Sequence, residues 1–229
     1  MIIAIILLLI FFILAYMVMG NSILLNRYLG GIVGIFEQPQ TMEEQLKASI
    51  MLADDYYESK KYNLAEKEYI HSLSLDEHNS YVYNRLGMLY SFQNNVIDSI
   101  ESFKFAVEND PKNPLYKSNL GLSALKDKQY GLAIENLESV CLEDPNISRI
   151  ISLARAYKGV NRFEDGLTLL VETKTNDKKE QISLYNLMGE ICIEAGNITM
   201  GEDVLRKSLA LDKKNKITLA LVKKLSQST

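Results

Sequence analysis

Like residues recur 34 positions apart through most of this sequence of 229 residues. Leu86-Gly87 is followed at that spacing by Leu120-Gly121, and Pro111 by Pro145. A fixed period of this length marks a repeat architecture, in which every copy forms one small supersecondary unit. Each unit leaves an apolar face that only the next unit covers, so the copies stack into a solenoid.

Composition indicates what each unit is made of. Leu, Ala, Glu and Lys are common and there are only 4 prolines, which favours helices over strands. The net charge of −4 is spread along the chain without a long basic run, which argues against a nucleic-acid partner. The predicted fold class is therefore all-α.

The second copy of the period shows its pattern most fully. It contains two aromatic residues around a Leu-Gly pair, then a small residue, a large apolar residue, an alanine and a proline: Tyr83, Leu86, Gly87, Tyr90, Ser99, Phe103, Ala106 and Pro111. This pattern resembles the tetratricopeptide repeat, a pair of antiparallel helices, and the resemblance covers Leu46 to Asn215. It implies a right-handed superhelix of five copies, at 46–79, 80–113, 114–146, 147–181 and 182–215. The periodic apolar residues of 216–229 predict a capping helix that closes the stack.

Residue size explains why the pattern suits a helix pair. Gly87 and Ser99 are small enough to let two helices approach closely, and Phe103 then fills the seam between them. Pro111 ends the second helix, because proline has no backbone N–H to continue the hydrogen-bond ladder.

Residues 1–20 contain no charged side chain and predict a transmembrane anchor. The apolar run from Ile2 to Met19 is long enough to cross the hydrocarbon core as one helix. A cleavable signal peptide needs a basic front, a shorter apolar region and small residues at the cut, and this run has none of these. We therefore expect a retained, single-pass anchor.

Residues 21–45 are expected to form a juxtamembrane apolar segment and a polar linker. The segment 23–36 is too short to cross again, and it either lies at the interface or packs through Gly30 and Gly34 against another membrane segment. Thr41 and Glu44 have the spacing of a capping box for the next helix. Arg27 is the basic residue next to the span, and the positive-inside rule then places the repeat domain in the cytoplasm.

No motif for chemistry stands out, so we predict neither catalytic residues, nor a metal site, nor a cofactor. His71 and His78 are expected at the surface, and Cys141 and Cys192 as small buried hydrophobes without a disulfide. The acidic pair Asp54-Asp55 is most simply a solvated helix face.

The resemblance implies a binding function instead. In tetratricopeptide-repeat proteins the first helix of each pair lines a concave groove that accepts a peptide or a partner helix. The candidate groove residues are Tyr81, Asn84, Met88, Ser91, Leu115, Ser118, Leu122, Leu125, Arg155 and Lys158. The carboxylate clamp of the chaperone-binding members is absent, because Ile50, Asp54, Arg85, Leu115 and Asn119 stand at its places.

Three functions fit these features. The first is a membrane-anchored scaffold that recruits a protein or peptide through the groove. The second is a periplasmic or secretion-linked chaperone. The third is a structural subunit of a larger membrane complex, held through the apolar segment 23–36.

Overall fold

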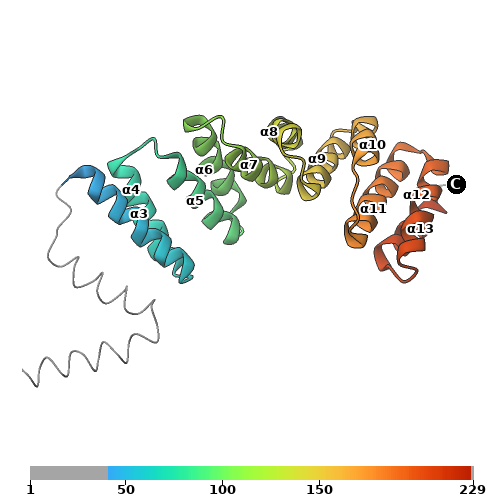
Figure 1. Cartoon of the computed structure of the whole chain (residues 1–229), viewed down its shortest axis with the longest axis horizontal. Helices are drawn as coiled ribbons and strands as arrows, with labels where there is room; N and C mark the ends of the chain where they lie inside the picture. The colour runs from blue at the N-terminus through green and yellow to red at the C-terminus, as the bar shows by residue number, and fades with distance from the viewer. Residues whose placement is uncertain (1–40, 228–229) are drawn as a thin grey trace, which may run out of the picture.

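A computed structural model describes residues 41–227 of the chain. Within this range it contains helices and no strand, arranged as five antiparallel pairs and one final helix in an elongated row (Figure 1). The helices are α3 (Met42–Glu58), α4 (Tyr62–Leu75), α5 (Ser80–Phe92), α6 (Val96–Asn109), α7 (Pro114–Lys126), α8 (Tyr130–Glu143), α9 (Ile147–Gly159), α10 (Phe163–Glu172), α11 (Lys178–Ala195), α12 (Ile198–Leu211) and α13 (Lys216–Leu225). The predicted all-α solenoid is confirmed for this part of the chain.

Local capping explains where most of the helices begin. The predicted capping box of Thr41 and Glu44 is present, with each side chain bonded to the backbone N–H of the other residue. Asparagine serves as the N-cap of several later helices, because its side-chain oxygen accepts a hydrogen bond from a free N–H of the first turn. These residues are Asn79, Asn95, Asn113, Asn146, Asn197 and Asn215.

The turn inside each helix pair needs one residue in the left-handed conformation. Its φ lies between 59° and 73° in all five pairs, at Lys60, Asn94, Lys128, Asn161 and Gly196. Glycine adopts this conformation without strain and asparagine tolerates it, whereas lysine does so at a cost. The turns therefore share their geometry although their residues differ.

The seam within each of three pairs is closed by a glycine that faces a large apolar side chain. A Cβ placed on Gly87 would lie 2.6 Å from the ring of Phe103, which is 2% exposed. Gly121 faces Leu137 and Gly189 faces Leu205 in the same manner. The predicted close approach at Gly87 is confirmed, and Ser99 adds a hydrogen bond of 2.9 Å to the Gly87 carbonyl.

Successive pairs are joined mainly by apolar contacts and by a few buried polar groups. The second helix of one pair and the first helix of the next pack together throughout the row. Ser99 of α6 contacts Ser123 of α7 at 3.2 Å between hydroxyl oxygens. At the far end, Thr218 of α13 donates to Asn186 of α11 at 2.8 Å. Each pair is therefore held by its neighbours, as a linear solenoid requires.

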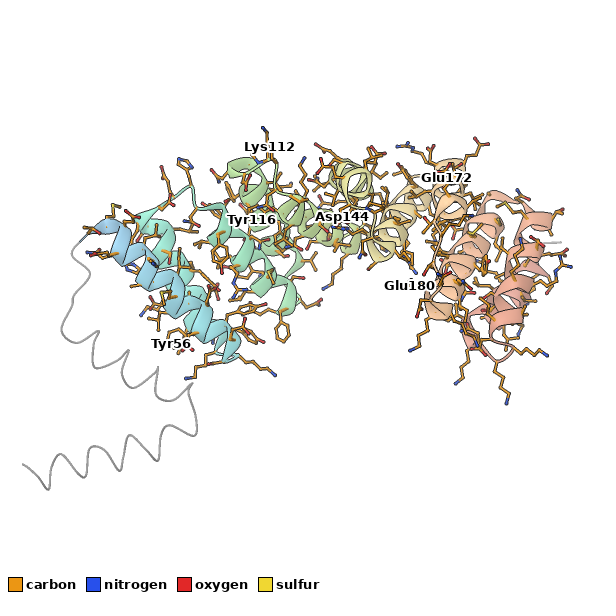
Figure 2. All side chains as sticks on the ribbon, in the orientation of Figure 1. Tyr56, Lys112, Tyr116, Asp144, Glu172 and Glu180 are labelled. Carbon is orange, nitrogen blue, oxygen red and sulfur yellow. The ribbon has the colours of Figure 1, made fainter. Side chains whose placement is uncertain are left out.

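The fourth and fifth pairs are joined differently. Helix α10 ends at Glu172, and residues 173–177 form a non-helical linker. Helix α11 then begins at Lys178, four residues before the expected start of the fifth copy at 182. Figure 2 shows Glu172 at the upper edge of the row and Glu180 at the lower edge, so the linker crosses the width of the stack. Gln181 anchors it by donating to the Thr175 carbonyl at 2.7 Å.

The predicted anchor at 1–20 and the juxtamembrane segment 23–36 lie outside the described residues. Among residues 41–227, none of the helices has the length and apolar character needed to cross a membrane.

Candidate protein-binding groove

A shallow hollow of about 320 Å³ opens between α5 and α7, with α3 at one side. Its wall is mainly apolar and aromatic, with a few hydroxyl and amide groups: Tyr57, Met88, Ser91, Phe92, Phe103, Asn119, Leu122 and Ser123. We call this the α5–α7 hollow. Most of its residues come from the first helices of the first three pairs, the helices that were expected to line the groove.

Three of the ten predicted groove residues, Met88, Ser91 and Leu122, line the α5–α7 hollow. Tyr81 and Leu115 are exposed at the start of α5 and α7, at 39% and 55% of their surface. Leu125, near the end of α7, is half-buried.

Asn84 and Ser118 are buried, at 3% and 7% exposure, so the expectation that they present open side chains is wrong. Asn84 lies where α5 contacts α7. The Asn119 amide donates to the Asn84 carbonyl oxygen at 2.8 Å, which joins the second pair to the third. Asn84 is therefore part of the junction between the second and third pairs.

Arg155 and Lys158 lie on α9, away from the α5–α7 hollow. Arg155 is exposed, whereas Lys158 forms ion pairs with Glu190 and Glu194 of α11 at 3.0 and 3.2 Å. Burial alone would lower the pKa of Lys158, but the hydrogen bonds and charges of the two glutamates raise it above its usual value. Lys158 therefore joins the fourth and fifth pairs.

A hydrogen-bonded cluster lies beside the hollow and corrects one prediction. Asp54 of α3 accepts from Tyr69 at 2.5 Å, from Tyr81 at 2.7 Å and from Arg85 at 2.8 Å. The guanidinium of Arg85 also lies over the Tyr57 ring, 4.6 Å from its centroid. The interpretation of Asp54 as part of a solvated helix face is wrong, because its carboxylate joins the first pair to the second.

Burial first, and then the hydrogen bond to Asp54, raise the pKa of Tyr81 to about 12. The same two causes, in the same order, raise the pKa of Tyr69. Both phenols are therefore proton donors at neutral pH, and they hold the carboxylate that faces Arg85. Since Arg85 is already paired with Asp54, its charge is largely neutralised at the rim of the groove.

Phe92 is the main groove residue that the sequence analysis missed. It is the last residue of α5, is 64% exposed, and its ring lies 4.7 Å from the Tyr62 ring, centroid to centroid. The signal was available, because Phe92 lies four residues after Met88 and therefore on the same helix face.

The expected surface histidines and buried cysteines are confirmed. Burial raises the pKa of the Cys192 thiol to about 11. Among residues 41–227 no group of three or more His, Cys, Asp or Glu side chains could hold a metal ion. The α5–α7 hollow is therefore a partly apolar surface with hydrogen-bonding groups at its edge.

The described residues form an all-α solenoid of antiparallel helix pairs. The family model described as tetratricopeptide repeat matches residues 80–113 and 182–215, which have the bounds of the second and fifth copies of the sequence period. The chain therefore contains tetratricopeptide repeats, as the resemblance implied.

Solved structures share the fold over most of the chain. YrrB, described as a TPR protein with an unusual peptide-binding site, is 14% identical, with a TM-score of 0.72 over 81% of this chain and 100% of its own. A MamA fragment from Desulfovibrio magneticus RS-1 is 17% identical, with a TM-score of 0.67 over 77% of this chain and 99% of its own. The complex of Naa15/Naa10 bound to HypK-THB is 17% identical, with a TM-score of 0.56 over 82% of this chain and 29% of that one. At these identities the likeness concerns the fold.

Proposed function

We propose that this protein is a membrane-anchored scaffold that binds a segment of a partner protein in the α5–α7 hollow. The observation that carries the proposal is the exposure of Phe92 beside Met88 and Leu122. An aromatic ring left open at the rim of a concave apolar surface costs free energy in water, and a bound apolar side chain removes that cost.

The hollow favours a peptide or a partner helix with one or two apolar anchor side chains. Its volume of about 320 Å³ suits one or two side chains rather than a folded domain. Asn119 and Ser91 supply hydrogen-bonding groups at the wall for a bound backbone. YrrB, a TPR protein of similar fold with an unusual peptide-binding site, supports this mode of binding.

Residues 1–20 hold the repeats at the membrane in this proposal, with Arg27 on the cytoplasmic side. The apolar length of Ile2 to Met19 supports the anchor. A reporter fused after Thr229 tests the orientation: activity only in the cytoplasm is expected. A reporter active only outside the cytoplasm would support the chaperone alternative.

Site-specific photo-crosslinking tests the hollow. A photoreactive phenylalanine derivative replaces Phe92 in the full chain, and irradiation of native membranes is expected to attach a discrete partner segment with apolar anchor residues. The matched control places the same group at Ile97 of α6, which is 73% exposed and lies outside the hollow. Mass spectrometry identifies the attached segment.

The double substitution Met88→Glu with Leu122→Glu is expected to abolish the crosslink at position 92, because it puts two charges into an apolar contact. Circular dichroism checks that the variant retains a cooperative helical melt. Crosslinking that persists in this variant, or that is equal at positions 92 and 97, places the binding surface elsewhere.

A further inference from the structure

The two ends of the solenoid expose helix faces that its inner helices bury. Within the described residues, helix α3 packs against α4 and helix α13 packs against α11 and α12. Figure 1 places α3 and α13 at opposite ends of the row. Each end helix therefore has one face directed away from the stack.

The outer face of α3 corresponds to an interface elsewhere in the chain. Val82, Leu86 and Leu89 of α5 are at most 4% exposed, in the core cluster that they form with the first pair. The residues 34 positions earlier on α3 are Ala48, Leu52 and Asp55, and all three are exposed. Leu52 and its neighbour Met51 are exposed at 41% and 63%. We call Ala48, Met51, Leu52 and Asp55 the N-terminal end face.

The outer face of α13 ends the series of helix pairs. Thr218, Leu221 and Leu225 form its buried side. Lys223 stands 34 positions after Gly189, the glycine that lets α12 approach α11. A lysine at this position prevents another helix from packing against α13 as closely as α12 packs against α11. Lys216 and Lys223 lie with Leu219, which is 47% exposed, and Val222, which is 37% exposed, on what we call the C-terminal end face.

The N-terminal end face carries Asp55, the C-terminal end face carries Lys216 and Lys223, and the segments around the two faces have the same opposite signs. Residues 41–79, which form the first pair and its caps, contain nine acidic and four basic residues. Residues 213–227 contain five lysines and no acidic residue. Opposite potentials steer two surfaces together and select a single orientation, while Leu52 and Met51 offer apolar area to Leu219 and Val222.

We propose that the C-terminal end face of one molecule binds the N-terminal end face of a second copy, head to tail. Neither face pairs with itself, because that would bring like charges together. The contact is therefore heterologous, and it leaves one free face of each kind at the ends of every assembly, so growth continues beyond a dimer unless a ring closes. The inference is independent of what binds in the α5–α7 hollow.

Cysteine pairs test the geometry. Ala48 and Ala220 are exposed, one at each end, and the native Cys141 and Cys192 are buried. The full chain in mild detergent is treated with a short bis-maleimide. The variant with both Ala48→Cys and Ala220→Cys is expected to give a ladder of dimers, trimers and larger species. A mixture of the two single variants is expected to give dimers only, and each single variant alone is expected to give none.

Charge variants test what holds the contact. Lys216→Glu with Lys223→Glu, placed in the double-cysteine background, is expected to lower the ladder yield about tenfold, because like charges then meet. Adding Met51→Lys and Asp55→Lys to the same chain reverses the other face and is expected to restore the ladder. Raising the salt concentration is expected to weaken the ladder of the double-cysteine chain, because exposed charges are screened.

Two results overturn the proposal. Dimers from the Ala220→Cys variant alone show a two-fold contact through α13 instead. The second result combines two observations. The double-cysteine chain gives no ladder, and the thiol of the Ala220→Cys variant is protected from a water-soluble maleimide only in vesicles that contain anionic lipid. That outcome places the lysine-rich C-terminal end face on a membrane surface.

Discussion

The hydroxyl of Tyr81 donates a hydrogen bond of 2.7 Å to Asp54, and the two residues belong to different helix pairs. Arg85 of α5 contacts the other oxygen of the same carboxylate at 2.8 Å. One acidic side chain of α3 thus receives two donors from α5. The relative position of the first and second pairs depends on this carboxylate.

Asp54→Asn is expected to destabilise the protein by about 1–3 kcal/mol, since it leaves Arg85 with a side-chain exposure of 15% and without its closest ion-pair partner. Urea denaturation followed by circular dichroism measures the change. Glu135→Gln on α8 is the control, because Glu135 is exposed and an exposed substitution of this kind changes stability by about 0.5 kcal/mol or less. Equal losses in Asp54→Asn and Glu135→Gln would contradict the structural role of Asp54.

Stability is expected to fall at alkaline pH partly through Tyr81. Its pKa is raised from 10.0 to about 12 by burial and by Asp54, so the unfolded chain releases this proton at a lower pH than the folded chain does. The neutral phenol supports the folded state below about pH 10, and its contribution is lost as the pH rises to about 12. Comparing the denaturation midpoints of the wild type and of Tyr81→Phe across this pH range isolates the contribution of Tyr81. The stability of the variant is expected to fall less steeply with pH.

Gly87→Ala is expected to cost about 1–3 kcal/mol, because the new Cβ would lie 2.6 Å from the buried Phe103 ring. Gly131→Ala is the matched control on α8, where a Cβ meets no atom within 4 Å. Alanine favours a helix more than glycine does, so the control is expected to be neutral or slightly stabilising. Thermal denaturation compares the two, and a similar loss in both would mean that the seam at Gly87 tolerates a methyl group.

Lys128→Gly is expected to stabilise the protein by about 0.5–1 kcal/mol, because Lys128 has a φ of 61° in the turn between α7 and α8. Asn94 has the same φ, and Asn94→Gly is expected to gain less, since asparagine tolerates this conformation. Chemical denaturation of both variants ranks them, and the reverse order would contradict the explanation by backbone strain.

The helix pairs could be predicted from the sequence because residue size acts locally at a fixed spacing. A glycine at 87 and a phenylalanine at 103 fill one seam, and the period repeats that geometry along the chain. The capping box at Thr41 and Glu44 is equally local, since its two residues are three positions apart.

The surface of the groove could not be predicted in the same detail. Exposure depends on how far each pair is rotated over its neighbour, and the repeat position alone does not determine this. Asn84 and Ser118 are buried, whereas Phe92 stays open at the end of α5. Asp54 finds Tyr81 and Arg85 across 27 and 31 positions of sequence, a separation that no local pattern reveals.

The nearest-neighbour packing of the row has a mechanical consequence. A pull between the two ends of the described chain passes through the junctions in series, so every junction bears the same load and the weakest opens first. The linker at 173–177 is the longest of the non-helical connections between successive pairs in the described chain, and the short helix α13 is held by its contacts with α11 and α12. Under tension we therefore expect the protein to lengthen in discrete steps, as one junction opens after another.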